Sequence, residues 1–318
     1  MSGSGRGAVV TLGEALVSLR SVGPLAIGGP LTMHAAGAEL NVAVALARLG
    51  HESSWGGVLG DDELGEFILR SLAAERVDAS RVRRDSRPTG IMFLEARTPE
   101  VSRVFYNRRG SAGARLSPHD VDHILDRDLA WLHLTGITPA LSDVARAAVL
   151  HAAERCRRRA VPFSVDINFR SKLWSTDEAA EVLPWLIEGA EVVIGSPAEL
   201  ALAAPDGATL EAAAEELLGT GVGEVVAKLG ADGAQAFTPH GALHAPAFPV
   251  RAVDTVGAGD AFTAGYLSAR LDGEDVAGRL RRGCLLGAFA VGHLGDWEGL
   301  PRRDELALLD LGDGETHR

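Results

Sequence analysis

The chain has few of the residues that build disulfide frameworks, zinc sites or nucleic-acid surfaces. Its 318 residues include only two cysteines, Cys156 and Cys284, which form neither a disulfide framework nor a metal quartet and suit a reducing cytoplasm. Two pairs of the ten histidines, His119/His123 and His240/His244, have His-x-x-x-His spacing, yet we expect no zinc site, since such a site needs three or four protein ligands. The net charge is −12, whereas binding to nucleic acid or to an anionic membrane requires clustered Lys and Arg. We therefore expect neither as a partner.

Long apolar runs are also missing. The first ten residues, MSGSGRGAVV, lack the apolar stretch of a secretory signal, and no uncharged run is long enough to span a bilayer. These absences predict a soluble, cytoplasmic protein. No repeat with a period of about 20 to 50 residues and no low-complexity linker divides the chain, so we expect residues 1–318 to form one domain.

Short apolar runs alternate with longer segments of helical period over most of the chain. This alternation is typical of an α/β fold in which helices cover both faces of a mainly parallel central sheet. Such sheets bind their ligands at the carboxyl ends of the strands. The predicted strands are Ala8–Leu12, Leu129–Leu134, Phe163–Ile167, Val192–Gly195 and Val225–Leu229, and the predicted helices are Leu40–Leu49, Asp143–Arg159 and Leu210–Leu218.

One region, Pro88–Gly113, breaks this alternation. It reads as two strands around a turn at Thr98-Pro99-Glu100, with no helix between them. The pattern predicts a small β lid, formed by residues 14–36 and 86–113, over the edge of the sheet. The alternative is an edge hairpin that only extends the sheet. The polar residues at the end of the second strand, Tyr106 to Arg109, favour the lid.

The stretch Ala252–Tyr266, AVDTVGAGDAFTAGY, carries the clearest chemistry. Its small residues allow a tight turn with bare N–H groups, followed by a helix whose positive end attracts anions. We expect the turn formed by Gly257, Ala258 and Gly259 to hold the oxygens of a transferring phosphoryl group. Asp260 would then accept the proton of the attacking hydroxyl. On spacing alone, a helix-cap role for Asp260 is an equal alternative.

The run DTVGAGDAFTAG, Asp254 to Gly265, resembles the signature of the ribokinase-like (PfkB) sugar kinases at every defining position. Similar matches are GAELNVA from Gly37, GDDELG from Gly60, PTG from Pro88 and VAKLGADGA from Val226. The resemblance implies the ribokinase-like fold, ATP as the phosphoryl donor with Mg²⁺ as its cofactor, and Asp260 as the catalytic base. The ATP-binding residues that it implies are Ser196, Lys228, Gly230, Gly233, Gly257 and Gly259.

Further segments resemble one branch of that family, the 2-keto-3-deoxygluconate kinases. They are VFYNRRGSA from Val104, HLTGITPA from His133, DINFR from Asp166 and GDWEG from Gly295. The substrate of this branch is a sugar acid, and guanidinium groups recognise a carboxylate through paired, charge-assisted hydrogen bonds. The substrate-binding residues that the resemblance implies are Gly37, Asn41, Tyr106, Arg108, Ile137, Asp166, Asn168, Arg170 and Asp296.

Two lid positions depart from this branch. Ile91-Met92 stands where the branch commonly has a tyrosine, and Asn107 stands where it often has a second one. The sugar acid and its epimer are therefore left open. The alternatives are a kinase of a neutral sugar such as fructose or ribose, and a catalytically idle sugar-binding regulator on the same fold.

Three further expectations concern the nucleotide and the assembly. Ser196-Pro197-Ala198-Glu199 fits a helix capping box, and the resemblance also implies that Glu199 organises Mg²⁺ through water. Lys228 follows an apolar strand and would balance phosphate charge, with a solvated strand-end lysine as the alternative. The resemblance finally implies a homodimer in which two lids pack together.

Overall fold

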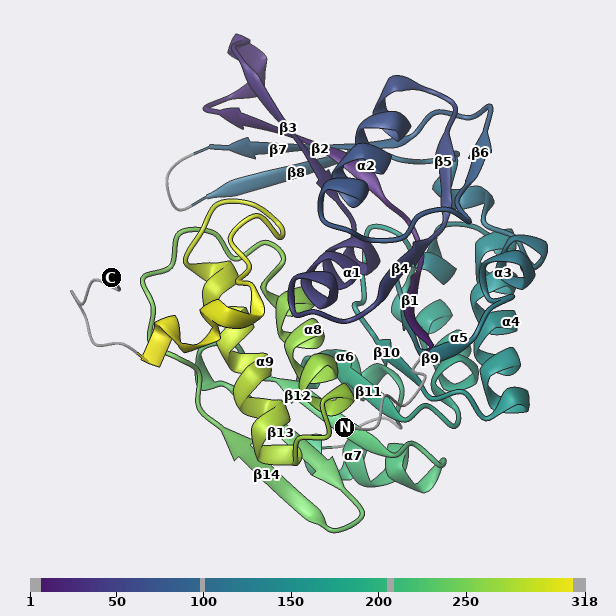
Figure 1. Ribbon diagram of the computed structural model, residues 1–318, viewed down its shortest axis with the longest axis vertical. Coiled ribbons are helices and arrows are strands. Elements are labelled where there is room, and N and C mark those ends of the chain that lie inside the picture. The colour runs from purple at the N-terminus through teal and green to yellow at the C-terminus, as the bar shows by residue number, and fades with distance from the viewer. Residues whose placement is uncertain (1–6, 98–100, 205–208, 311–318) are drawn as a thin grey trace.

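The centre of the computed structural model is an eight-stranded sheet, shown in Figure 1, and the residues described are 7–97, 101–204 and 209–310. The strand order is β14-β13-β12-β11-β10-β9-β1-β4. Neighbours from β12 to β4 run parallel, and only β13 and β14 are antiparallel, at one edge. The predicted mainly parallel sheet is confirmed. Its strands are β1 Ala8–Leu12, β4 Ser53–Gly56, β9 Leu129–Thr135, β10 Phe163–Asp166, β11 Val192–Gly195, β12 Glu224–Lys228, β13 Ala234–Thr238 and β14 Gly241–Ala245.

Helices cover both faces of this sheet. Buried residues of α3 to α7 pack on one face, and those of α1, α8 and α9 pack on the other. None of the described helices has the length and apolar character needed to cross a membrane. The helices are α1 Ala38–Arg48, α2 Glu63–Ala74, α3 Pro118–Ile124, α4 Asp143–Arg159, α5 Thr176–Ile187, α6 Pro197–Leu202, α7 Leu210–Gly219, α8 Ala258–Leu271 and α9 Val276–Val291.

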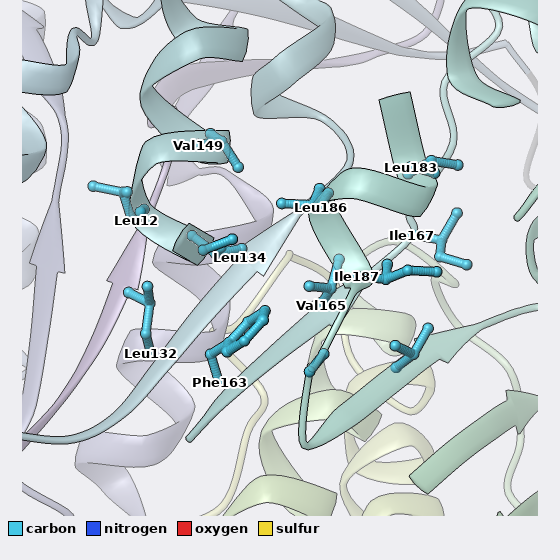
Figure 2. Close-up of a cluster of buried hydrophobic side chains, with 14 of the residues drawn as sticks. Leu12, Leu132, Leu134, Val149, Phe163, Val165, Ile167, Leu183, Leu186 and Ile187 are labelled. Carbon is cyan, nitrogen blue, oxygen red and sulfur yellow. The ribbon is translucent and has the colours of Figure 1, made fainter. Parts of the chain in front are cut away.

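The central strands carry mostly apolar side chains on both faces of the sheet, since helices cover both faces. Figure 2 shows Leu132 and Leu134 of β9 among the side chains of α4 and α5, together with Phe163 of β10. Trp131, the residue directly before Leu132, points the other way and belongs to the cluster on the opposite face. Burying one such large apolar side chain stabilises the fold by roughly 1.5–3 kcal/mol. The continuous apolar runs seen in the sequence are therefore what a doubly covered parallel sheet requires.

A second sheet of four strands lies apart from the central one, at the top of Figure 1. We call it the lid sheet; its order is β3-β2-β7-β8, with β2 Leu16–Val22, β3 Leu31–Ala36, β7 Gly90–Ala96 and β8 Ser102–Asn107. β7 and β8 pair antiparallel, but neither joins the central sheet, so the edge-hairpin alternative is wrong. The turn expected at Thr98-Pro99-Glu100 lies outside the described residues. The short strands β5 Val58–Gly60 and β6 Arg83–Asp85 pair separately.

Candidate active site

A cavity of about 400 Å³ lies between the lid sheet and the carboxyl ends of the central strands. The lid contributes side chains of β2, β7 and β8, and the body contributes the start of α1, the ends of β10 and β12, and the turn before α8. The structure thus brings together residues as far apart in the chain as Glu14 and Asp296. The expected site residues that line the cavity are Gly37, Asn41, Tyr106, Arg108, Ile137, Asn168, Arg170, Glu199, Lys228, Gly257, Gly259, Asp260 and Asp296.

The other expected residues lie outside this lining. Asp166 is buried behind Lys228, and Ala258 is the first residue of α8. Ser196 caps α6, while Gly230 belongs to the turn between β12 and β13. Gly233 has a φ of +93°, and a Cβ there would lie 2.0 Å from the carbonyl oxygen of Ala245. The fold alone therefore accounts for this last glycine.

The turn before α8 has the geometry of an anion site. Gly257 precedes the helix with a φ of +75°, a conformation that L side chains rarely adopt, and a Cβ there would lie 2.0 Å from the carbonyl oxygen of Asp296. Among the described residues, no acceptor meets the N–H groups of Gly257 and Gly259. These free donors lie at the positive end of α8, where the cavity begins.

Asp260 lies in the first turn of α8, and its side chain points into the cavity. Its Oδ2 accepts a hydrogen bond from Nδ2 of Asn41 at 2.7 Å, and its Oδ1 accepts one from Nδ2 of Asn168 at 3.4 Å. Burial raises the pKa of this carboxyl, while the Asn41 hydrogen bond opposes the rise. A carboxylate oriented by two distant amides, and not by its own helix N–H groups, argues against the helix-cap alternative.

Lys228 forms a buried ion pair beside the same turn. Its Nζ donates to both oxygens of Asp166, at 2.9 and 2.7 Å, and the hydroxyl of Thr263 donates to Asp166 at 3.0 Å. Burial alone would lower the pKa of Lys228, but the charges of Asp166 and Glu199 outweigh it, and the pKa is raised. A Cβ at Gly259 would lie 3.4 Å from this ammonium group. The solvated-lysine alternative is therefore wrong, and a fixed positive charge stands next to the glycine turn.

The two arginines expected to bind a carboxylate differ in their surroundings. Arg108 forms an ion pair with Glu14 and stacks over the ring of Tyr106, 5.1 Å from its centroid. The side chain of Glu14 is only 1% exposed and also accepts a hydrogen bond from Ser111 at 3.0 Å. Arg170 is exposed, lines the cavity, and has no ion-pair partner among the described residues. Only Arg170 is therefore free to bind a ligand carboxylate with its whole guanidinium.

The two departures in the lid have unequal consequences. Met92 is 7% exposed and lines the cavity opposite Tyr106 in the β7–β8 register. Asn107 pairs with Ile91, one position along, so its side chain points to the other face of β8 and is exposed. The expectation that both positions alter the substrate pocket is thus wrong for Asn107. Because successive side chains of a strand point to opposite faces, the sequence alone could have separated the two positions. Of the two, only Met92 changes the wall of the cavity.

Glu199 caps its helix and also faces the cavity. The capping box is confirmed, because Ser196 accepts from the Glu199 N–H and Oε2 of Glu199 accepts from the Ser196 N–H at 2.7 Å. Oε1 accepts from the N–H of Phe169 at 2.9 Å, and the side chain still lines the cavity. Within the described part of the chain, no group of three or more His, Cys, Asp or Glu side chains could hold a metal by itself.

Two acidic residues of the site were not predicted from the sequence, Glu14 and Glu39. Glu39 is fully buried at the start of α1, where the hydroxyls of Thr135 and Thr138 donate to Oε1 at 2.5 and 2.8 Å. Burial raises the pKa of Glu39 to about 7. An acid inside an otherwise apolar stretch, as in GEALV and GAELNVA, was the available signal.

Known proteins match almost the whole chain. Residues 8–303 match the profile of pfkB family carbohydrate kinases. A 2-dehydro-3-deoxygluconokinase of Thermoproteus tenax is 37% identical over 310 residues, 95% of this chain and 93% of that protein. One of Bacillus subtilis strain 168 is 35% identical, covering 89% of this chain and 88% of its own length.

A crystal structure of a putative Ribokinase II from E. coli, in complex with ATP and Mg²⁺, superposes with a TM-score of 0.87 at 27% identity. The match covers 95% of this chain and 98% of that one. The ribokinase-like architecture expected from the sequence is confirmed. The chain belongs to the pfkB family of carbohydrate kinases and is a phosphotransferase that acts on a sugar hydroxyl.

Proposed function

We propose that the protein transfers the γ-phosphoryl group of ATP to the terminal hydroxyl of 2-keto-3-deoxygluconate or a close relative. The observation that carries this proposal is a single cavity in which the glycine turn and Asp260 face Arg108 and Arg170. The relatives named 2-dehydro-3-deoxygluconokinase, at 35% and 37% identity, support this substrate class, since 2-dehydro and 2-keto name the same group.

In the proposed reaction, Asp260 accepts the proton as the sugar oxygen attacks the γ-phosphorus. Asn41 and Asn168 hold the carboxylate, and such a positioned base typically contributes about 10²- to 10⁴-fold. The N–H groups of Gly257 and Gly259 bind the phosphoryl oxygens, and each well-placed donor is worth about 10²- to 10³-fold. Lys228 supplies positive charge beside them.

The sugar acid fits the remaining walls. Arg170 binds the carboxylate through its free guanidinium, while Arg108, fixed by Glu14, offers the N–H groups that face the cavity. Leu16, Met92, Leu94 and Val104 form an apolar strip of the lid in the same cavity. A hydroxyl against this strip would lose its hydrogen bonds, so the strip suits the deoxygenated carbon of a 3-deoxy sugar.

ATP and Mg²⁺ complete the proposal. Mg²⁺ keeps several waters and binds proteins through one or two carboxylates together with substrate phosphates, so it requires no cluster of acidic residues. The carboxylate of Glu199, which lines the cavity with both oxygens oriented by backbone N–H groups, would hold it through water. When bound, Mg²⁺ neutralises charge that develops on the phosphates.

We also propose that residues 1–318 form one domain whose lid, residues 14–36 and 86–113, closes over the sugar and excludes water, which limits ATP hydrolysis. The outer face of the lid sheet supports a homodimer through the lids. Leu31, Met33 and Phe105 share the face opposite the cavity and are 40%, 44% and 41% exposed. Light scattering would test this assembly. We expect a dimer for the wild type and a monomer for Met33→Glu, because the substitution places a charged carboxylate in the apolar interface.

The substrate is tested by steady-state phosphorylation of 2-keto-3-deoxygluconate, fructose and ribose by the purified protein. We expect kcat/KM to be highest for the keto-deoxy acid. A preference of tenfold or more for either neutral sugar would overturn the assignment and favour a fructokinase or ribokinase activity. Sugar binding without any ADP release would instead indicate a regulator.

A further inference from the structure

Arg20 is a lid residue whose side chain reaches out of its own sheet. It lies on β2, and its NH1 donates to Oδ2 of Asp254 at 2.8 Å while its NH2 donates to Oδ2 of Asp296 at 2.7 Å. The three side chains are 10%, 14% and 6% exposed, so the whole cluster is largely withdrawn from water. One guanidinium thus bridges two body segments that lie more than 230 residues away in the chain.

Both carboxylates belong to segments that shape the glycine turn. Oδ1 of Asp254 accepts the N–H of Val256 at 3.1 Å, directly before Gly257. The backbone carbonyl of Asp296 is the atom against which Gly257 packs. Through these two contacts, the position of Arg20 is linked to the backbone that carries the expected phosphoryl-binding N–H groups.

The segment Gly295–Gly299 also contacts the lid through β3. Nε1 of Trp297 donates to the carbonyl of Ala35 at 2.8 Å, and Nδ1 of His34 lies 2.6 Å from Oε1 of Glu298. In Figure 1 this segment belongs to the yellow part of the chain beneath the lid strands. The lid and the turn before α8 are therefore joined through one continuous, hydrogen-bonded connection.

The acidic side chains of Asp254 and Asp296 are paired with a cation only when the lid places Arg20 between them. With Arg20 withdrawn, Asp254 and Asp296 would face each other beside the turn without a cation, and burial already raises the pKa of Asp296 to about 6. Two unpaired acids next to the phosphoryl site repel the anionic phosphates of ATP. With Arg20 seated, the same acids are neutralised and fixed.

We propose that Arg20 is a positioning residue that makes phosphoryl transfer conditional on lid closure, by clamping Asp254 and Asp296 and thereby ordering the turn Asp254–Asp260. The inference rests on the proposed role of that turn. It assigns the lid a second task besides covering the sugar. Sugar binding, which draws the lid down, prepares the phosphate site at the other end of the cavity.

Hydrogen exchange of the peptide spanning residues 254–260, with and without bound sugar acid, reports this coupling directly. In wild type, the sugar acid is expected to slow exchange there at least tenfold. Arg20→Gln should still bind the sugar acid within about threefold but lose the slowing, with kcat reduced about tenfold or more and the KM for ATP raised. Arg20→Lys, which cannot bridge both carboxylates, should lie between the two.

Arg103→Gln is the matched control, because among the described residues Arg103 forms its ion pair with Glu95 and stacks over Phe105, both inside the lid sheet, and its side chain is 56% exposed. It should retain the coupling and the wild-type kcat. If Arg20→Gln does not fold, the double variant Arg20→Gln with Asp296→Asn leaves less unpaired buried charge and should fold, yet still lack the coupling. Slowing of wild-type size together with kcat within threefold in either Arg20 variant would overturn the proposal.

The assay also separates this inference from the substrate assignment. Exchange needs only a sugar that binds, so a wrong choice of sugar would show in wild type, in the comparison with fructose and ribose. A failed clamp would show as equal behaviour of wild type and the Arg20 variant with whichever sugar binds. The two failures are therefore distinguishable.

Discussion

Arg108 and Arg170 look equivalent in the sequence but are different groups in the molecule. Arg108 is buried against Glu14, so part of its hydrogen-bonding capacity serves the protein itself. Arg170 is exposed at the cavity and has no ion-pair partner in the described chain. Residue type suggested carboxylate recognition for both arginines, but the internal partner of Arg108 lies 94 positions earlier and no local pattern reveals it.

This difference predicts that alanine substitution of Arg170 affects substrate binding, whereas alanine substitution of Arg108 affects stability. Arg170→Ala should leave stability unchanged and raise KM for the sugar acid, because a hydrogen bond to a charged group is worth about 1.5–3 kcal/mol, or roughly 10- to 150-fold. Arg108→Ala leaves Glu14 buried without its cation and should destabilise the fold by roughly 3–5 kcal/mol. Steady-state kinetics and urea unfolding would separate the two; Arg109→Ala serves as the surface control.

A stability loss for Arg170→Ala as large as that for Arg108→Ala would contradict the account. The same would follow if Arg170→Ala left KM unchanged. The first result would mean that the guanidinium of Arg170 supports the fold, and the second would mean that it does not hold the carboxylate.

At the scale of elements, steric contacts alone restrict the backbone of the glycine turn that precedes α8. Gly257 adopts a φ of +75° against the carbonyl of Asp296. The sequence predicted the turn and the following helix, because small residues allow a tight turn and the Ala-rich run after them favours a helix. It did not predict the packing against Asp296, since that contact joins segments 39 positions apart through backbone atoms.

Gly257→Ala should therefore impair both folding and catalysis. A Cβ 2.0 Å from a backbone oxygen forces the turn to move, and a non-glycine residue at positive φ adds strain of about 1–3 kcal/mol. We expect a lower melting temperature and a kcat reduced at least tenfold. Gly287→Ala in α9 is the matched control, because its Cβ would meet its nearest atom at an ordinary 3.7 Å. Equal behaviour of the two variants would contradict the steric argument.

The five strands predicted for the central sheet match the structure almost to the residue, whereas β4, β13 and the contacts between distant elements were not predicted. Ala8–Leu12 and Val192–Gly195 coincide with β1 and β11, because a strand buried on both faces leaves a nearly continuous apolar run. By contrast, Asn41 meets Asp260 across 219 positions and Arg20 reaches Asp296 across 276. Such contacts depend on how the lid and body are assembled, which periodicity does not encode.

For the whole molecule, a buried histidine links stability to pH. His133 on β9 is 0% exposed, its Nδ1 lies 2.9 Å from Oγ of Ser164, and burial lowers its pKa to about 3. The unfolded chain binds a proton on this side chain below about pH 6.5, but the folded chain does not until about pH 3. Stability is therefore full above pH 6.5 and falls as pH falls, by up to about 1.4 kcal/mol per unit.

His133→Phe should remove this contribution. Between pH 6.5 and 3, the free energy of unfolding should fall less steeply in the variant than in wild type, as measured by urea unfolding at each pH. The test compares how steeply the free energy of unfolding changes with pH. A packing effect of the larger phenyl ring shifts that free energy equally at every pH and therefore does not affect the comparison. Glu39, whose raised pKa acts with the opposite sign between pH 4.5 and 7, is common to both proteins and cancels. Parallel curves would contradict the prediction.

The most direct test of the central claim, that Asp260 is the base of a phosphotransferase, is to measure transfer and binding in the same variant. Asp260→Asn keeps the shape and the contact with Asn41 but cannot accept the proton. We predict that ADP release with the sugar acid falls at least 10²-fold, while calorimetric affinities for ATP and sugar acid stay within a few-fold of wild type. Transfer within tenfold of wild type would contradict the account.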